Sequence, residues 1–478
     1  MRKSRQPDDG GTAGAVSQPG QETIVAVITP PGEGGIAALR LAGPKSSDIL
    51  QKHFIASRPD ATSIADWQPF LMHHGTVRAT LDGHAVDEVM AVRMPAGQSY
   101  TGLDQIELYC HGGTHVVKLI QDLLLQSGAR AAEPGEFTRL AFENGRIDLA
   151  EAEGVAEMIA ASTDVSYRAA REHLLGAYSA HLESMRHDLI GGIAKCEAAV
   201  DFPEEGIEPE RLAIMRQNVA SILTQLKLLI RSYRTGRIAK EGFKIALGGR
   251  PNAGKSSLFN LLLRKERALV TPTAGTTRDY LSEWVDIGGV PVNLIDTAGL
   301  RKSGGAIERA GMDRARGVIE EADLLVWIVD ISQKGWRARL TEDLKSLPKT
   351  RRLLVHNKTD NVKNWSNKDL HRSEEGVSLS CKTEIGLEQL HEKLTEIIQW
   401  HLPDLTSGLV VTSARHLQKL SESMLDLEEA DSQLKDGASP EIVVFSLRQS
   451  VNAIDEIVGR VYTEEILGEI FSKFCIGK

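Results

Sequence analysis

A glycine-rich loop that ends in a lysine and a serine is the segment of this chain most suited to chemistry. Residues 249–256 fit every fixed position of the pattern G-x-x-x-x-G-K-[ST], which binds nucleotide phosphates. The glycines let backbone N–H groups point at the phosphates, and a helix N-terminus adds partial positive charge. We expect Lys255 to reach the β- and γ-phosphates and the Ser256 hydroxyl to bind Mg²⁺. The pattern therefore predicts a nucleoside triphosphate site.

A second motif, Asn357-Lys358-Thr359-Asp360, indicates which base is bound. The Asp360 carboxylate can accept hydrogen bonds from the N1–H and 2-amino groups of guanine, which adenine does not offer. Ser380-Cys381-Lys382 is similar to the S-A-K loop that packs on guanine in GTPases, although by itself it would not identify a site. The sequence therefore favours GTP over ATP.

Two further motifs lie between these and have the character of GTPase switches. Asp296 begins the segment 296–299, which places a carboxylate near Mg²⁺ and the amide of Gly299 near the γ-phosphate. Thr277, in the segment 275–279, can complete the Mg²⁺ shell when the γ-phosphate is present. The residues expected to contact GTP belong to these motifs and the loops beside them: Asn252, Ala253, Gly254, Lys255, Ser256, Ser257, Thr271, Pro272, Thr273, Ala274, Gly275, Thr276, Thr277, Asp296, Thr297, Ala298, Gly299, Asn357, Lys358, Asp360, Ser380, Cys381 and Lys382.

The residue that orients the attacking water is not the usual one. Leu300 stands where Ras-like GTPases carry a glutamine, and a leucine cannot hold a water molecule. Glu308 is the candidate, with the alternative that it only complements a helix macrodipole. No arginine finger can be assigned, although Arg301 and Arg309 are close in sequence. Asn252 resembles the residue by which potassium-activated GTPases hold a monovalent cation beside the phosphates.

Length and composition limit the class of protein. A chain of 478 residues exceeds one ordinary core, so two or three domains are expected. The 56 Lys and Arg residues against 65 Asp and Glu give a net charge of −9, which argues against a protein that mainly coats nucleic acid but leaves room for local basic patches. The four cysteines include no C-x-x-C pair, so neither a disulfide framework nor a zinc site is expected. A reducing cytoplasm fits this pattern, and no apolar run approaches the length of a membrane span.

The elements that must position these motifs follow from the apolar pattern. Strands are expected at 243–247, 291–295, 353–356 and 376–379, and a helix is expected to open at 257–262, directly after the phosphate loop. Residues 1–21 are expected to form a disordered tail, and 22–138 have an α+β texture that begins with a strand at 23–28. Helical periodicity fills 139–241 and returns over 403–478, on either side of a GTPase domain at 242–402. The fold class is therefore α/β and α+β multidomain, with a P-loop GTPase domain inserted in a helical domain.

Blocks at both ends of the chain carry a specific resemblance. They are Thr29 to Ile36 with Arg40, Glu107 with His111-Gly112-Gly113, Pro134 to Phe137, and the final residues Phe474 to Lys478 with their C-x-G-K pattern. From about residue 22 to the end, the chain resembles the MnmE (TrmE) family of tRNA modification GTPases. The resemblance implies an N-terminal tetrahydrofolate-binding domain that also mediates dimerisation, a helical domain and an inserted GTPase domain.

The resemblance also implies a reaction and its participants. A homodimer would work in the cytoplasm with a flavoprotein partner, MnmG, and would add an aminomethyl or carboxymethylaminomethyl group at C5 of the wobble uridine of certain tRNAs. The one-carbon unit would come from 5,10-methylenetetrahydrofolate or a related folate, and FAD on the partner would supply the redox chemistry. Which tRNAs are modified, and whether ammonia or glycine is the amine donor, stay open.

Functional residues are carried over from the family motifs one at a time. Arg40, Glu107, Arg146 and Lys478 would surround the folate, although the family often has Lys where this chain has Arg146, which keeps the charge and changes the geometry. Potassium would be held by the side chains of Asn252 and Thr271, the Thr273 carbonyl and Thr276, and Glu308 matches the family's water-positioning glutamate. For Cys475, a chemical role and a role as a small apolar side chain both stay open.

Two questions are left open by the sequence. The basic residues Arg231, Arg234, Arg237, Lys240 and Lys244 are suited either to tRNA phosphates or to a solvated hinge between domains. Besides a tRNA-modifying enzyme, the GTPase motifs also fit a ribosome-assembly GTPase and a regulatory switch without substrate chemistry. The former would be expected to carry a basic RNA-binding module in place of the folate-like block.

Overall fold

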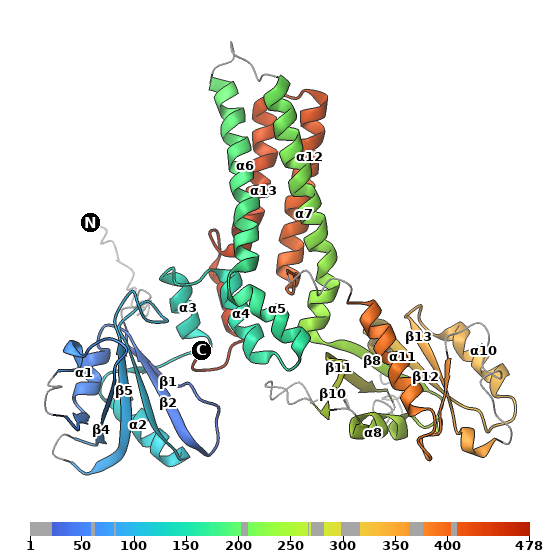
Figure 1. The fold of residues 1–478 in the computed structure, drawn as a ribbon, viewed down its shortest axis with the longest axis horizontal. Coiled ribbons are helices and arrows are strands. Elements are labelled where there is room, and N and C mark those ends of the chain that lie inside the picture. The colour runs from blue at the N-terminus through green and yellow to red at the C-terminus, as the bar shows by residue number, and fades with distance from the viewer. Residues whose placement is uncertain are drawn as a thin grey trace, which may run out of the picture. The chain divides into compact units, whose positions relative to one another are not determined.

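The computed structural model describes residues 22–58, 63–80, 83–201, 209–265, 267–268, 282–297, 316–362, 376–402 and 409–478. The tail predicted to be disordered, residues 1–21, lies outside these ranges. The chain divides into two compact units, one of Met1–Ala152 with Tyr462–Lys478 and the other of Glu153–Val461 (Figure 1). No helix in the described ranges is both long enough and apolar enough to cross a membrane.

The first unit is built on a seven-stranded sheet with the order β3-β4-β5-β6-β2-β1-β7. Most neighbouring strands are antiparallel, and only β7 pairs in parallel with β1. The strands and helices of this unit are β1 Ile24–Val27, β2 Gly34–Ala42, α1 Ser46–Gln51, β3 Phe54–Ala56, η1 Ile64–Asp66, β4 Met72–Arg78, β5 Ala85–Met94, β6 Gln105–Gly112, α2 Thr114–Gln126, β7 Arg130–Ala131, α3 Glu136–Glu143 and α14 Glu464–Phe471.

The two faces of this sheet are covered differently. On one face, α1 and α2 bury a core in which Leu39 and Leu108 of the sheet meet Ile120 of α2. On the other face, α3 packs over β1 with Phe137 and Leu140. The C-terminal tail joins this side, because Ile476 forms a β-bridge with Pro134 and the backbone N–H of Phe137 donates to the carbonyl of Lys478. The two ends of the sequence therefore build one unit.

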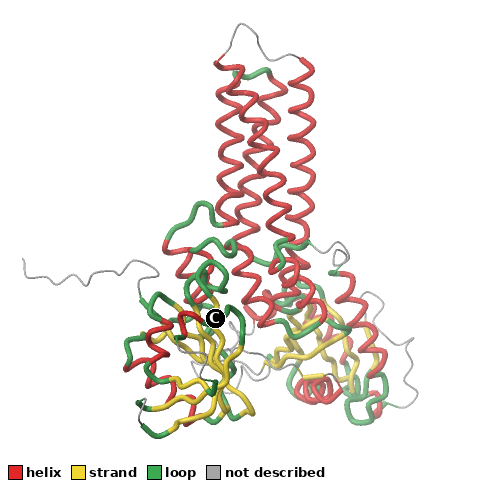
Figure 2. The backbone as a smooth tube through the Cα atoms, turned by 60° about the vertical axis from the view of Figure 1, so that its left-hand side comes forward, coloured by secondary structure: helices red, strands yellow, loops and turns green. Residues whose placement is uncertain are grey.

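Four long helices form a bundle in the second unit: α6 Ala177–Asp201, α7 Pro209–Glu241, α12 Ala414–Asp436 and α13 Pro440–Val458. In α12, Leu420, Leu427 and Leu434 recur at seven-residue spacing and are buried, which gives the helix one apolar face. The helix α13 packs against α12 and α6, and α12 packs against α7. Figure 2 shows the long helices of this bundle side by side. Two shorter helices, α4 Leu149–Ala160 and α5 Asp164–Leu174, precede the bundle in sequence.

The GTPase domain is a doubly wound sheet of seven strands in the order β14-β13-β12-β8-β11-β10-β9. The strands β14 to β11 in this order are parallel, and β10 and β9 continue the sheet antiparallel. Its elements are β8 Phe243–Gly249, α8 Lys255–Lys265, β9 Arg267–Ala268, β10 Ser282–Ile287, β11 Val290–Asp296, β12 Leu324–Asp330, α10 Trp336–Ser346, β13 Arg352–Asn357, η3 Thr359–Asn361, β14 Gly376–Ser378 and α11 Leu387–Trp400.

The predicted elements around the motifs are confirmed. Strands β8, β11, β13 and β14 and helix α8 coincide with the expected segments to within a few residues, and β1 begins the N-terminal unit as expected. Helices from before and after the GTPase domain pack into one bundle, which confirms the predicted insertion. The domain boundaries drawn from the sequence stay predictions.

Candidate functional site

The phosphate loop joins the carboxyl end of β8 to the N-terminus of α8, as the motif requires. Lys255 is buried, and its ammonium group donates to the carbonyls of Gly249 at 3.0 Å and Arg250 at 3.1 Å. Gly254 has a φ of +107°, and a side chain there would overlap the amide group of Asn357. The loop therefore needs glycine for its conformation and for the close approach of a second loop.

Two side chains at the end of this loop are suited to a divalent cation. The Ser256 hydroxyl donates to the carboxylate of Asp296 at 3.0 Å, and Asp296 is buried at the end of the neighbouring strand β11. A hydroxyl and a carboxylate oxygen are ligands that Mg²⁺ prefers, and the ion keeps several waters of its own. These residues fit Mg²⁺ bound to nucleotide phosphates, as the sequence predicts.

The base-binding loops are held together by Asn357, at the carboxyl end of β13. Its side-chain amide donates to the carbonyl of Ala253 at 2.8 Å, and its oxygen accepts from the backbone N–H groups of Lys358 and Cys381 at 2.8 and 3.1 Å. The Ser380 hydroxyl donates to Asp360 at 2.7 Å. One asparagine thus ties the phosphate loop to both predicted base loops, and Ser380 orients the carboxylate that would select guanine.

These loops line one cavity of about 790 Å³, within the range of ligand sites in proteins. Its position at the carboxyl ends of parallel strands is where open α/β sheets bind ligands. The lining residues are Pro251, Asn252, Gly254, Lys255, Ser256, Ser257, Asn357, Lys358, Asp360, Asn361, Cys381 and Lys382. Sequence reasoning included most of these and missed Pro251 and Asn361, which neighbour the motifs.

Asp330 is a residue of this site that the sequence did not point out. It ends β12, and its carboxylate accepts from the ammonium group of Lys358 at 2.7 Å. Lys358 has a φ of +67°, in the left-handed region that is costly for a residue with a side chain. The ion pair with Asp330 helps to hold Lys358 in that conformation. Burial raises the pKa of the nearby Cys381 thiol to about 11, so the thiol stays neutral near pH 7. The sequence shows only an aspartate that ends an apolar strand in the GTPase block, which does not by itself distinguish Asp330.

Several predicted GTPase residues lie outside the described ranges. They are Thr271, Pro272, Thr273, Ala274, Gly275, Thr276, Thr277, Ala298, Gly299 and Glu308. Asn252 and Thr297 are described, and Asn252 has a φ of +60°, in the left-handed region that asparagine tolerates better than most residues. All the potassium ligands, Asn252 included, the second Mg²⁺ ligand Thr277 and the water-orienting Glu308 therefore stay predictions.

A polar cluster lies in the N-terminal unit, where Arg40 of β2 and Glu107 of β6 face each other across the strands. The guanidinium group of Arg40 is 2.9 Å from the Glu107 carboxylate and lies over the rings of Tyr100 and Phe137, at 5.1 and 5.4 Å from their centroids. Glu107 is buried and also accepts from Tyr109 at 2.6 Å. This contact brings together two of the four residues predicted to bind folate.

The other two predicted folate residues lie on segments that touch the same cluster. Arg146 donates to the carbonyl of Gly97 at 2.8 Å, in the loop that carries Tyr100. Lys478 accepts the backbone hydrogen bond of Phe137, and Cys475 of the same tail is exposed. Tyr100, Tyr109 and Phe137 were not predicted as site residues. Tyr109 follows Glu107 by two positions on a strand, so its place on the same face is readable from the sequence.

Burial and the neighbouring carboxylate keep the Tyr109 hydroxyl in its protonated form. Burial is the larger cause, and together with the hydrogen bond to Glu107 it raises the pKa of Tyr109 to about 12. The hydroxyl is therefore a donor over the neutral pH range, and the Glu107 carboxylate receives donors from both Arg40 and Tyr109.

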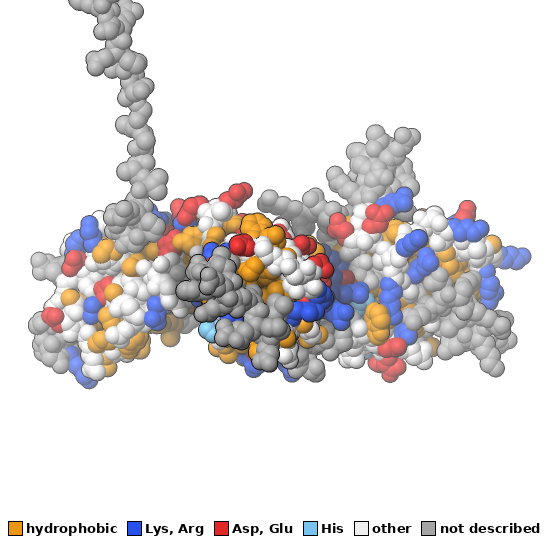
Figure 3. All heavy atoms as spheres, turned by 90° about the horizontal axis from the view of Figure 1, so that it is seen from above, with side chains coloured by type: hydrophobic (Ala, Val, Ile, Leu, Met, Phe, Trp, Pro, Cys, Tyr) orange, Lys and Arg blue, Asp and Glu red, His pale blue; other side chains and the backbone are white. Residues whose placement is uncertain are grey.

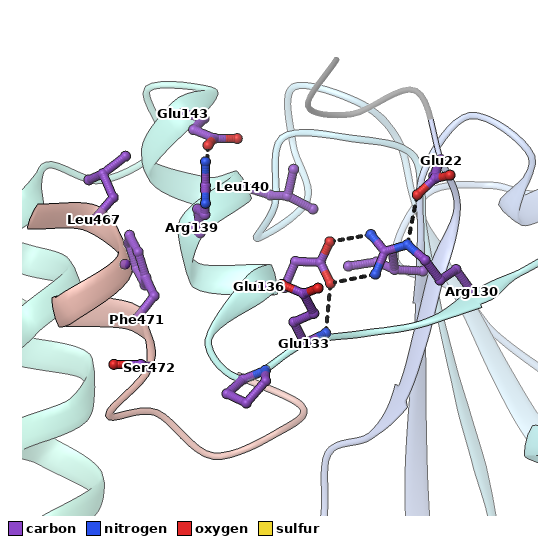
Figure 4. Close-up of a pocket in the computed structure, with 13 residues that line it drawn as sticks. Glu22, Arg130, Glu133, Glu136, Arg139, Leu140, Glu143, Leu467, Phe471 and Ser472 are labelled. Carbon is purple, nitrogen blue, oxygen red and sulfur yellow. Dashed lines mark hydrogen bonds and ion pairs between the residues drawn. The ribbon is translucent and has the colours of Figure 1, made fainter. Parts of the chain in front are cut away.

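A separate hollow of about 360 Å³ lies between α3, the start of β1 and α14. Figure 4 shows its arginines bound to glutamates: Arg130 lies between Glu22 and Glu136, and Arg139 donates to Glu143 at 2.7 Å. None of the four predicted folate residues lines it. Because both arginines already have carboxylate partners, this hollow is poorly suited to the acidic tail of a folate.

Comparisons with known proteins give the family. The family model described as the MnmE helical domain matches residues 149–475, and the one described as the GTP-binding protein TrmE N-terminus matches residues 23–146. The tRNA modification GTPase MnmE of Natranaerobius thermophilus is 37% identical over 466 residues, which cover 96% of this chain and all of that protein. The chain belongs to the MnmE family.

Two further proteins are similar. The MnmE of Aquifex aeolicus is 38% identical over 462 residues, again across 96% of this chain and 100% of its own length. The solved G domain of the T. maritima FeoB iron transporter is 29% identical, with a TM-score of 0.26, and covers 33% of this chain and 99% of its own. As a member of the MnmE family the chain is a GTPase, as its phosphate and base loops predict.

Proposed function

We propose that the chain hydrolyses GTP to drive tRNA modification, and that with the flavoprotein MnmG it adds an aminomethyl or carboxymethylaminomethyl group at C5 of the wobble uridine. The observation that carries this proposal is the presence in one chain of a guanine-type nucleotide pocket and of the Arg40–Glu107 cluster beside the C-terminal tail. The match to relatives named tRNA modification GTPases over their whole length supports it.

In the GTPase domain, each residue has one part in hydrolysis. Backbone amides of the phosphate loop and Lys255 hold the phosphates, and Ser256 with Thr277 binds Mg²⁺ near Asp296. Glu308 orients the attacking water, because Leu300 has no polar atom for that task. Asp360, oriented by Ser380, accepts the hydrogen bonds of guanine.

A potassium ion beside the phosphates would take the place of an arginine finger. Asn252, the side chain of Thr271, the Thr273 carbonyl and Thr276 would hold it, all through oxygen atoms, which suit a hard cation. The left-handed backbone at Asn252 supports the choice of asparagine there. A fixed positive charge would stabilise the charge that develops on the phosphates in the transition state.

In the N-terminal unit, the residues present fit a folate. The half-buried ring of Tyr100, packed against the fully buried Phe137, offers an apolar surface. The buried Glu107 carboxylate can accept from pterin N–H groups in exchange for one of its present donors. Arg146 and Lys478 supply positive charge for the carboxylates of the glutamate tail, and Arg40 holds the Glu107 carboxylate in place through their ion pair. When bound, 5,10-methylenetetrahydrofolate or a related folate supplies the one-carbon unit, and FAD on the partner supplies the redox chemistry.

The proposed assembly is a homodimer formed through the N-terminal unit. The sheet face that α1 and α2 leave uncovered carries Ile36, Ile55 and Met72, with exposed fractions of 68%, 38% and 46%. Pairing of the strands places these side chains on one face, and a second copy would remove them from water. The four cysteines are free in the structure, which supports a reducing cytoplasm as the place of action.

Mass spectrometry of wobble nucleosides tests the proposal. A strain that lacks the gene for this chain should accumulate tRNA with unmodified C5 at the wobble uridine, and the wild-type chain should restore the modification. A chain with Arg40→Ala should restore it poorly. Normal modification in the deletion strain, together with abnormal ribosomal subunit profiles, would instead favour a ribosome-assembly GTPase.

A further inference from the structure

The structure divides the basic run of α7 into two groups. Arg237 is bound to Asp323, and the Lys240 ammonium group lies 2.8 Å from Glu157, so both serve contacts inside the protein. Arg231 and Arg234 are exposed and form no ion pair with any other residue in the described ranges. Positive charge that is left without a carboxylate partner is available for a ligand.

An exposed tryptophan lies next to this charge. Trp400 ends α11, and 68% of its surface is exposed. The guanidinium group of Arg351 lies 5.1 Å from the centroid of its ring. The rings of His401 and Trp400 pack edge-on, with their centroids 5.0 Å apart. His401 is itself buried against Phe243, so this packing restricts the position of the tryptophan ring.

Arg234 reaches the same place from α7. Burial is the main cause that lowers the pKa of His401, and the charges of Arg234 and Arg351 lower it further. The Thr235 hydroxyl is 3.5 Å from the His401 carbonyl. Arg231 lies one turn earlier on α7 and on the same side as Arg234. We call Arg231, Arg234, Arg351 and Trp400 the Trp400 surface.

In the part of the chain that the structure describes, the Asp323 carboxylate near this surface is already bound by other groups. The charge of the Asp323 carboxylate acts to raise the pKa of His401. Its two oxygens accept from Arg237 and from the backbone N–H of Lys244. In the view from above, Lys and Arg side chains gather beside the helices of the bundle (Figure 3). A chain with a net charge of −9 that binds a polyanion has to collect its positive charge locally, and here it is collected around an exposed aromatic ring.

The combination selects a kind of ligand. Arginines bind phosphates, and an exposed tryptophan gives an unpaired base a surface on which to stack. We propose that the Trp400 surface binds a single-stranded segment of tRNA, with the arginines on the phosphates and Trp400 against a base. The inference rests on the proposed function, because it takes tRNA as the substrate.

The surface lies at the opposite end of the sheet from GTP. Phe243 and Arg352 begin β8 and β13, so Trp400 and Arg351 lie near the amino ends of strands whose carboxyl ends form the nucleotide cavity. Substitutions on this surface should therefore change tRNA binding and leave basal GTP hydrolysis unchanged.

Binding of labelled tRNA to the full chain, measured by fluorescence anisotropy over a series of salt concentrations, tests the proposal. The variants are Arg231→Ala with Arg234→Ala, Trp400→Leu and Trp400→Phe. Arg448→Ala with Arg460→Ala is the matched control, because it also removes two exposed positive charges, but from α13 and the residues just after it, where they pair with Glu197 and Glu183. Phe445→Leu is the control for losing an exposed aromatic ring, since Phe445 is 64% exposed on the same helix.

The double arginine variant should bind about tenfold more weakly or worse, and the slope of log affinity against log salt should fall by about 1.4, or about 0.7 for each single-strand phosphate contact. Trp400→Leu should weaken binding about tenfold, Trp400→Phe should keep most of it, and both controls should match the wild type. All variants should hydrolyse GTP at the wild-type basal rate. If the wild type binds tRNA and every variant binds it equally well, this inference is wrong and the proposed function is unaffected. An acidic protein would then be the better candidate ligand for this surface. Absence of tRNA binding by the wild type would contradict the proposed function and this inference together.

Discussion

The ammonium group of Lys240 lies 2.8 Å from the same oxygen of Glu157 that accepts a 2.6 Å hydrogen bond from the Thr412 hydroxyl. Lys240 is in the last turn of α7 before the GTPase domain, and Thr412 follows that domain. Beside them, His173 Nε2 is 2.9 Å from the Val410 carbonyl, and its Nδ1 is 3.2 Å from Glu157. One glutamate of α4 thus holds both segments through which the chain passes between the helical domain and the GTPase domain.

This joint should transmit the nucleotide state, so Lys240→Met should separate GTP hydrolysis from tRNA modification. In this variant the Glu157 carboxylate would keep its contacts with His173 and Thr412 but lose the ion pair with Lys240. The free energy of unfolding should fall by about 1–3 kcal/mol. Steady-state GTP turnover should stay within about twofold of wild type, while modification of tRNA in the presence of the flavoprotein should fall at least about fivefold.

Lys227→Met is the matched control for this substitution. Lys227 is on the same helix and pairs with Glu428 at 2.8 Å, but both side chains are largely exposed, so that pair adds little to stability. The control should modify tRNA normally. Equal modification by both variants would show that the joint carries no signal.

The pH dependence of stability should identify His173 as a cation in the folded state. Burial opposes its charge, but the hydrogen bond to Glu157 and the charge of that carboxylate outweigh burial and raise the pKa of His173 above 6.5. A raised histidine pKa adds stability that is complete below pH 6.5 and is lost as the pH rises through the folded-state value. The melting temperature of His173→Gln should therefore fall further below wild type at about pH 6 than at about pH 9.

His416 serves as an internal comparison for this experiment. Burial lowers its pKa despite the nearby Glu153, so its contribution to stability is complete above pH 6.5 and is lost as the pH falls. Because His416 is present in both the wild type and His173→Gln, its contribution largely cancels in the difference between their melting temperatures. A difference in melting temperature that grew with rising pH would show that His173 is neutral in the folded protein.

Asp360→Asn should change the base that the pocket prefers. The carboxylate accepts from guanine, whereas an amide nitrogen would donate to the 2-oxo group of xanthine. Affinity for GTP should drop at least about tenfold, and affinity for XTP should rise above it. Competition binding with a fluorescent nucleotide measures both. If the variant still preferred GTP over XTP, residues other than Asp360 would recognise the base.

Asn252→Ala should remove the preference for one monovalent cation. The wild type should hydrolyse GTP at least about tenfold faster in K⁺ than in Na⁺, if a fixed cation replaces an arginine finger. The variant should hydrolyse at one slow rate in both salts and still bind GTP, because Lys255 and the loop amides remain. Equal wild-type rates in K⁺ and Na⁺ would eliminate the potassium site.

Local sequence patterns predict the strands and loops around the nucleotide motifs well, because each motif carries its own strand and turn. Phosphate binding follows from a glycine loop between β8 and α8, and the place of Asp296 follows from its position at the end of β11. Asp330 was missed because its partner, Lys358, is 28 residues away, and an aspartate at a strand end has no distinguishing pattern.

Long-range polar contacts are the part that the sequence cannot supply. Nothing in the spacing of Glu157, Lys240 and Thr412 shows that they meet, since 255 residues separate the first from the last. The basic run on α7 left two interpretations open, tRNA phosphates or a solvated hinge, and both stay predictions. The structure adds that Arg237 and Lys240 bind carboxylates of the protein, whereas Arg231 and Arg234 are exposed. Contacts across α4, α5 and α7 depend on the packed fold.

The most direct measurement is the amount of C5-modified wobble uridine that the purified chain and the flavoprotein form on unmodified tRNA, quantified by mass spectrometry. The reaction should proceed with GTP, Mg²⁺, K⁺, a folate one-carbon donor and ammonia or glycine as the amine donor. It should stop when GTP is replaced by a non-hydrolysable analogue or when Glu308→Ala replaces the wild type. That variant should bind GTP and hydrolyse it at least about tenfold more slowly. Full modification by the variant despite slow hydrolysis, or equal modification without this chain, would contradict the proposal that GTP hydrolysis by this chain drives tRNA modification.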